Sequence, residues 1–129
     1  MHQVDVPAFK EAEVKVTKME TTIAGNKVKA EVMQFSGKEG VEGLFMTLDQ
    51  FRHAANKMNW TTGPAFFMNF TDCLKSAARK TWDRNTRNLN NNQRTLNRFN
   101  QEFNQLLNIY SQTTRAKEIM VEYLTHSKD

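Results

Sequence analysis

Hydrophobic and polar residues alternate in the first third of the chain. Val14 and Val16 flank a lysine, and residues 28–32 show the same alternation of small apolar and charged side chains. A period of two is typical of half-buried β-strands. The segment 24–27 between the two runs contains a Gly-Asn pair that suits a tight turn. A β-hairpin is therefore predicted within residues 13–39.

After residue 40 the apolar residues recur every three or four positions, which is the spacing of one face of an α-helix. The first such stripe covers residues 41–58. Further stripes predict a second helix from about residue 64 to 82, a third from 96 to 110 and a fourth from about 115 to 125. We expect these helices to be joined mostly by short turns.

The remaining segments are polar or irregular. Residues 1–12 show no period and contain Pro7, which predicts a flexible arm, and the asparagine-rich segment 83–94 is expected to be a loop. The predicted organisation is an arm at 1–12, an extended segment or hairpin at 13–39 and a helical domain at 40–129. The fold class is mainly α, with four or slightly more helices in an orthogonal arrangement.

Composition limits the classes of protein that this chain resembles. The chain has 129 residues, a net charge of +4 and one cysteine, so it cannot form an internal disulfide. No apolar run reaches the roughly 20 residues that span a bilayer, and the first residues lack the apolar core of a signal peptide. A cytoplasmic protein without a membrane partner is expected.

The usual signatures of catalysis are missing from the sequence. His2, His53 and His126 are far apart, and none lies at metal-ligand spacing from Cys73 or a carboxylate. The segment 61–64, Thr-Thr-Gly-Pro, lacks the lysine and the glycine run of a phosphate-binding loop, and it is typical of a helix start. We expect no enzyme activity, no metal, no cofactor and no small-molecule substrate.

Positive charge is concentrated between residues 75 and 98. A basic helix end followed by a polar loop can contact phosphates, or it can simply be a solvated surface. Trp82 lies inside this segment, where it either stacks on a base or closes the edge of the helical core. The residues expected to contact RNA phosphates are Lys75, Arg79, Lys80, Arg84 and Arg87.

The order of several motifs resembles the capsid-like domain of the retrotransposon Gag family. The motifs are Phe35-Ser36-Gly37 after an extended stretch, the Leu and Phe stripe of residues 42–51, Thr61-Thr62-Gly63-Pro64, the segment Leu74–Trp82, Phe99 with Phe103, and Met120 with Tyr123 and Leu124. The resemblance covers residues 30–126. It departs from the family at Lys75-Ser76, where a Gly or Ala is usual, and it lacks a zinc knuckle.

The resemblance implies a fold like that of a retroviral capsid N-terminal domain. It also implies a structural protein that self-assembles into retroelement particles enclosing RNA, with further copies of itself as its main partner. By the same resemblance, the first helix and the N-terminal hairpin are the candidates for subunit contacts, and the exposed residues expected there are Glu42, Asp49, Arg52 and Lys57. The alternatives are a small basic nucleic-acid-binding module and a helical protein–protein interaction domain.

Overall fold

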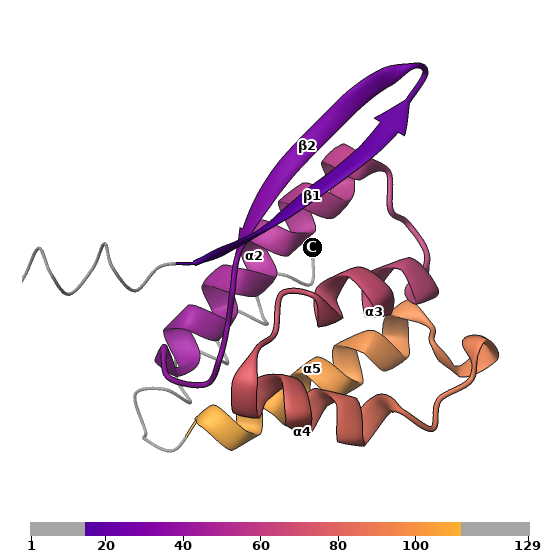
Figure 1. Ribbon diagram of the computed structural model, residues 1–129. Helices are drawn as coiled ribbons and strands as arrows, with labels where there is room; N and C mark the ends of the chain where they lie inside the picture. Colours follow the sequence, from indigo (N-terminus) through magenta and orange to yellow (C-terminus); the bar gives the residue numbers. More distant parts are fainter. Residues whose placement is uncertain (1–14, 112–129) are drawn as a thin grey trace, which may run out of the picture.

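The computed structural model describes residues 15–111, which form a hairpin and four α-helices. The elements are β1 (Val16–Ile23), β2 (Asn26–Met33), α2 (Gly40–Met58), α3 (Gly63–Thr71), α4 (Ser76–Thr86), the short 3₁₀ helix η1 (Asn91–Gln93) and α5 (Leu96–Tyr110). The hairpin lies along one side of α2, and the shorter helices α3, α4 and α5 lie on the other side (Figure 1). Helix α2 is therefore the middle layer.

The predicted hairpin is present, and its turn is set by two residues in left-handed conformations. Strand β1 pairs antiparallel with β2, with Ile23 opposite Asn26. Ala24 and Gly25 form the turn with φ of 51° and 82°, as a two-residue type I′ turn requires. The Gly-Asn pair is therefore not the centre of the turn, because Asn26 already belongs to β2.

The two faces of the hairpin differ in character. Met19 and Val32 point toward α2 and are buried. On the outer face Lys18 lies opposite Glu31, and two residues along the ladder Glu20 lies opposite Lys29. Opposite charges in these cross-strand positions favour the observed register, so the outer face is a solvated surface and the inner face is part of the core.

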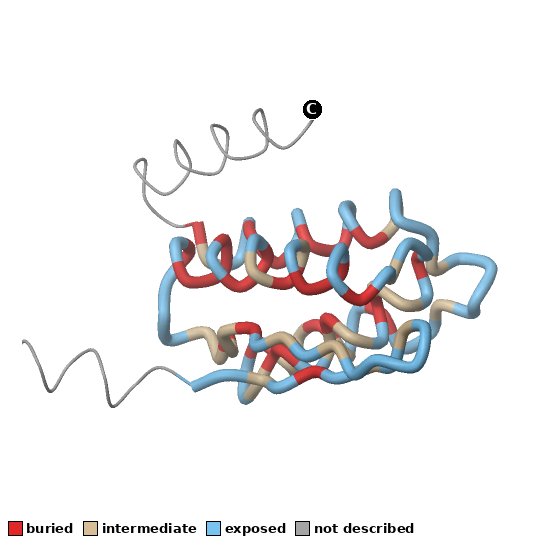
Figure 2. The backbone as a smooth tube through the Cα atoms, turned by 90° about the horizontal axis from the view of Figure 1, so that it is seen from above, coloured by how far each residue is buried: buried red, intermediate tan, exposed pale blue. Residues whose placement is uncertain are grey.

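Helix α2 matches the first predicted helix closely and carries much of the core. Its buried residues include Leu44, Leu48 and Phe51, which are almost completely inaccessible. The helix ends where Asn59 adopts a left-handed conformation with φ of 61°, which is a common way for a helix to terminate. Buried and exposed residues alternate along the helices (Figure 2).

The single helix predicted for residues 64–82 is wrong, because the chain breaks at residues 72–75 into α3 and α4. At the break the backbone pairs with the segment that follows β2. The Phe35 N–H donates to the Cys73 carbonyl at 2.9 Å, and the Lys75 N–H donates to the Phe35 carbonyl at 2.8 Å. These bonds form a parallel β-bridge in place of helical bonds. We call this contact the Phe35 bridge.

Residues around Phe35 fix the same region against α5. The Glu39 carboxylate accepts hydrogen bonds from the Ser36 N–H and from the Gly37 N–H. Gly37 has φ of 109°, and a Cβ there would lie 2.8 Å from the Tyr110 hydroxyl. Tyr110 also packs edge-on against Phe35, with ring centroids 5.0 Å apart. The loop before α2 is therefore closely fitted to the end of α5.

The segment 83–94, predicted as a loop, is partly helical. Helix α4 continues to Thr86, whose hydroxyl donates to the Trp82 carbonyl at 2.8 Å and which is buried. A turn of 3₁₀ helix at residues 91–93 follows before α5 begins. Residues 83–86 are helical despite their low helix propensity, because the burial of Thr86 in the tertiary structure stabilises the last turn of α4.

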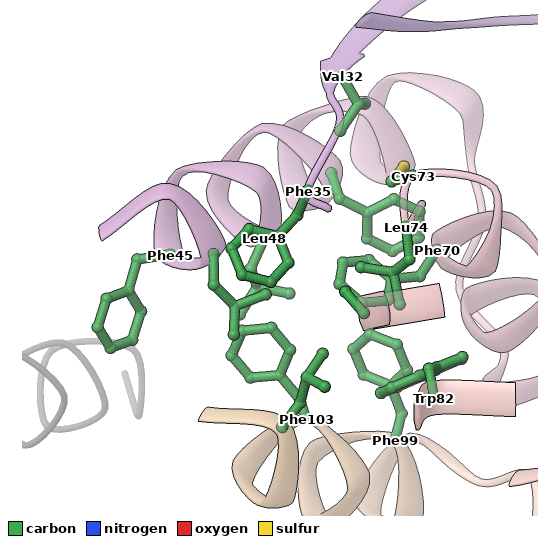
Figure 3. Close-up of a cluster of buried hydrophobic side chains, with 14 of the residues drawn as sticks. Val32, Phe35, Phe45, Leu48, Phe70, Cys73, Leu74, Trp82, Phe99 and Phe103 are labelled. Atoms are coloured by element: carbon green, nitrogen blue, oxygen red, sulfur yellow. The ribbon is translucent and has the colours of Figure 1, made fainter. Parts of the chain in front are cut away.

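An aromatic cluster fills the space between α2 and the three shorter helices. Phe70 lies near its centre, with its ring centroid 5.2 Å from Phe51, 5.3 Å from Trp82 and 5.3 Å from Phe99. The rings meet mostly edge-to-face, the favoured geometry for aromatic pairs. Figure 3 shows Phe35 and the aromatic side chains of the later helices converging on this cluster.

The expected fold class is therefore corrected. A short extended segment or β-hairpin was expected, followed by an orthogonal domain of four or slightly more helices like a retroviral capsid N-terminal domain. Instead, two eight-residue strands form a full layer of the molecule and contribute to its core, and the second helix is divided. The predicted arm at 1–12 and the predicted helix at 115–125 lie outside the described residues.

The Thr-Thr-Gly-Pro segment starts α3 as the sequence indicated. The Thr62 hydroxyl oxygen accepts a hydrogen bond from the Ala65 N–H, and proline occupies the first turn. Gly63 has a further reason to be glycine. A Cβ at this position would overlap the backbone carbonyl of Arg94, so the start of α3 touches the backbone just before α5.

We expect Gly63→Ala to lower the free energy of unfolding by about 1–3 kcal/mol, because the added methyl group must displace backbone rather than a flexible side chain. Chemical denaturation followed by circular dichroism measures the change. Thr61→Ala is a matched control, since Thr61 is exposed and makes no capping bond; its effect should stay within about 0.5 kcal/mol. Equal stability of Gly63→Ala and the control would contradict the close contact.

Candidate nucleic-acid interface

Helix α4 presents one buried face and one cationic face. Ala78, Trp82 and Thr86 recur every four residues and are buried. On the opposite side, Lys80, Arg84 and Arg87 are exposed and follow one another at steps of four and three residues, so they share one face of the helix or its C-terminal end. We call these three residues the cationic row.

Trp82 keeps this orientation fixed. Its side chain is 1% exposed, and its indole N–H donates to the Thr71 hydroxyl at 3.0 Å. Its ring also packs against Phe67 and Phe99. Of the two roles considered for Trp82, stacking on a base is therefore ruled out in this conformation, and the residue closes the core between α3, α4 and α5.

The cationic row has no partner among the described residues. The nearest acidic residue along the helix, Asp83, is engaged by Arg79, whose Nε lies 3.0 Å from its carboxylate oxygen. None of the three side chains of the row forms an ion pair or a hydrogen bond within residues 15–111, where Arg87 uses only its backbone N–H, which donates to the Asp83 carbonyl. Their charges are therefore available to an external anion.

The other two predicted phosphate contacts do not join this row. Arg79 is half-buried and paired, and it lies about 100° around the helix from Lys80. Lys75 is half-buried beside the Phe35 bridge, where its backbone N–H is already used. The structure thus brings three of the five predicted residues together and separates Lys75 and Arg79 from them.

Two further arginines of the basic segment have structural roles. Arg94 donates to the carbonyls of Leu89 and Thr86, both at 3.1 Å, and its guanidinium lies 5.3 Å from the centre of the Phe67 ring. Arg98 pairs at 2.8 Å with Glu102, whose side chain is 4% exposed. Burial of this acid requires such a partner, so neither arginine is free to bind an external anion.

The candidates for subunit contact lie along α2. Glu42, Asp49 and Lys57 are exposed and lie on one stripe of the helix together with Met46, which is 51% exposed, and His53. We call these five residues the α2 seam. The remaining candidate, Arg52, is half-buried and lies to one side of the seam.

The titratable groups of the described region do not form a reactive centre. Cys73 is fully buried, and burial, with a smaller contribution from Asp72, raises the pKa of its thiol to about 12. Partial burial raises the pKa of Glu39, but its hydrogen bonds from Ser36 and Gly37 outweigh this and hold it below its ordinary value. Burial and the nearby Glu39 raise the pKa of Tyr110. Residues 15–111 contain no cluster of His, Cys, Asp and Glu that could hold a metal ion.

Within the described range, no helix has both the length and the apolar character needed to cross a membrane. Comparison with protein-family models, curated proteins and solved structures finds no match to this chain. The geometry of the cationic row and the α2 seam must therefore support any functional conclusion, together with the order of the motifs.

The Cys73 thiol should be unreactive in the folded protein at mildly alkaline pH, because its pKa is raised to about 12 and it is buried. A colorimetric thiol reagent should label it only in concentrated guanidinium chloride. A raised folded pKa favours folding below the ordinary value near 9, so the free energy of unfolding should fall as pH rises from about 9 toward 12. Rapid labelling of the folded protein would contradict this environment.

Proposed function

We propose that this chain is a structural protein of the retroelement Gag type, which binds RNA through the cationic row and packs against further copies of itself. The observation that carries the proposal is the cationic row. Between residues 15 and 111 the sequence has 14 Lys and Arg against 8 Asp and Glu, a difference of 14 − 8 = +6. Cations that lack an internal partner contribute most to the binding of phosphates. The binding is favourable because it releases the counterions of the nucleic acid.

The positions of the Gag-like motifs support the proposal. Phe35 forms the bridge that separates α3 from α4, and Gly63 fits against the backbone before α5. The departure from the family at Lys75-Ser76 falls where Ser76 adopts φ of 54°. A left-handed backbone favours glycine, but the Gly or Ala of the family would stand directly after Leu74, at Lys75, whose backbone is extended with φ of −134°. The motifs thus mark sites with specific backbone requirements.

The charges of the α2 seam support self-association. Glu42 lies in the first turn of α2 and Lys57 in the last, where each also complements the helix dipole. If two copies of α2 pack antiparallel about a two-fold axis, Glu42 of each faces Lys57 of the other, and Met46 faces His53. Such a contact is isologous, and it also brings Asp49 of each copy close to the two-fold axis, where the two like charges oppose association. Exposed ion pairs contribute little energy, so we expect weak association that accumulates over many copies.

The same proposal places the protein in the cytoplasm, where Cys73 would remain reduced. Two simpler functions make different predictions. A monomeric nucleic-acid-binding module would bind RNA without self-association. A helical protein–protein interaction domain would associate without RNA dependence.

Replacing the cationic row, Lys80, Arg84 and Arg87, by glutamine should weaken RNA binding. For single-stranded RNA each lost phosphate contact lowers the slope of log affinity against log salt by about 0.7, so the triple variant should lose about 2 from this slope. Fluorescence anisotropy with a labelled RNA at several salt concentrations measures both affinity and slope.

The matched control removes the same charge from the hairpin, with Lys18, Lys27 and Lys29 replaced by glutamine. This variant should keep nearly the slope of the original protein. Equal losses in both variants would show that only net charge matters, and an unchanged slope in the α4 variant would refute the cationic row as the RNA site.

Self-association through the α2 seam should respond to charge reversal. Lys57→Glu alone places two acidic residues opposite each other in the antiparallel contact and should reduce association in sedimentation velocity at raised protein concentration. Combining it with Glu42→Lys restores opposite charges, so the double variant should associate about as well as the original protein. A protein that stays monomeric with and without RNA would contradict the structural role, whereas association that ignores the charge swap would place the contact elsewhere.

A further inference from the structure

The segment between α4 and α5 is unusually rich in side-chain amides. Residues 85–93 include five asparagines and a glutamine. The side chains of Asn88, Asn91 and Asn92 are exposed and make no hydrogen bond with other described residues. We call these three residues the amide loop. Their donors and acceptors are available to a ligand or to water.

This loop is held in one conformation although its sequence has little intrinsic structure. The Asn90 side chain accepts from the Gln93 N–H and the Gln93 side chain accepts from the Asn90 N–H, both at 3.0 Å. This reciprocal capping box fixes η1. The Arg94 side chain donates hydrogen bonds to the carbonyls of Thr86 and Leu89, and Leu89 packs against the hydrophobic core.

The fixed loop continues directly from the cationic row. Arg87 follows the last residue of α4, and Asn88 is the next residue along the chain. The orange loop at one end of the molecule joins α4 to α5 without covering either helix (Figure 1). Phosphate-binding cations and free amides therefore lie next to each other on one rigid part of the surface.

The two kinds of side chain have complementary chemistry toward RNA. Cations bind phosphates without regard to sequence, whereas an amide offers both a donor and an acceptor and can pair with the edge of a base. Base edges are accessible in single strands and loops but poorly accessible in the deep major groove of an RNA duplex. A loop whose backbone is already held in one conformation loses less entropy on binding.

We propose that the cationic row and the amide loop form one recognition surface for single-stranded RNA, in which the row binds phosphates and Asn88, Asn91 and Asn92 read base edges. This inference rests on the proposed RNA binding and adds base preference to it. Aromatic stacking does not provide the preference at this surface, because Trp82 is buried.

The test compares short single-stranded homopolymers of A, C and U, and an RNA duplex of the same length. The original protein should bind one homopolymer at least about tenfold more tightly than another, and more tightly than the duplex. The triple variant Asn88→Ala, Asn91→Ala and Asn92→Ala should lose this preference but keep the salt slope, because its cations are unchanged. The capping pair Asn90 and Gln93 is left intact, so the loop should stay folded.

The matched control replaces three other exposed asparagines, Asn56, Asn104 and Asn108, by alanine. It should bind each RNA as the original protein does. If the amide variant also keeps the original preference, while the cationic-row variant loses its salt slope, the inference is overturned and the proposed RNA binding survives. If the original protein binds RNA without salt dependence, the proposed function fails, and this inference fails with it.

Discussion

The Phe35 bridge is the contact on which the rest of this structure depends. Two backbone hydrogen bonds attach the segment after the hairpin to residues 73 and 75. They satisfy groups that a continuous helix would have paired internally, and they place Phe35 and Leu74 in the core without exposure to solvent. The hairpin layer and the helical layer are thereby joined by main-chain bonds as well as by packing against α2.

The functional surfaces follow from this break. Because α4 begins again at Ser76 in a new direction, Trp82 can pack against Phe67 and Phe70. The opposite face of α4 then carries Lys80 and Arg84 outward. The position of α4 thus both buries Trp82 and exposes the cations on the opposite face of the helix. The proposed RNA surface therefore rests on a rigid helix.

Sequence patterns predicted the elements with strong local signals and missed those decided by distant contacts. The stripe from Val41 to Met58 and the cap at Thr62 are local, and both are present. The break at residues 72–75 depends on Phe35, far away in the chain, and no pattern near Leu74 indicates it. The structure separates Arg79 and Lys75 from the rest of the predicted basic set for the same reason, because spacing in sequence does not report an ion pair or partial burial. The amides of residues 88–92 indicated only low helix propensity. The spacing of Asn90 and Gln93 is a local signal that could have predicted the capping box, whereas the contacts of Arg94 with Thr86 and Leu89 are seen only in the structure.

The Phe35 bridge also has a consequence for the order of folding. It joins positions about 40 residues apart, so closing it carries a larger loop-closure entropy cost than closing a contact within one helix. Before it closes, nothing local separates residues 64–82 into two helices, and the amphipathic stripe favours one straight helix. Early in folding, residues 64–82 are therefore expected to form one helix that is longer than α3 or α4. This helix divides only when the segment after the hairpin forms the Phe35 bridge.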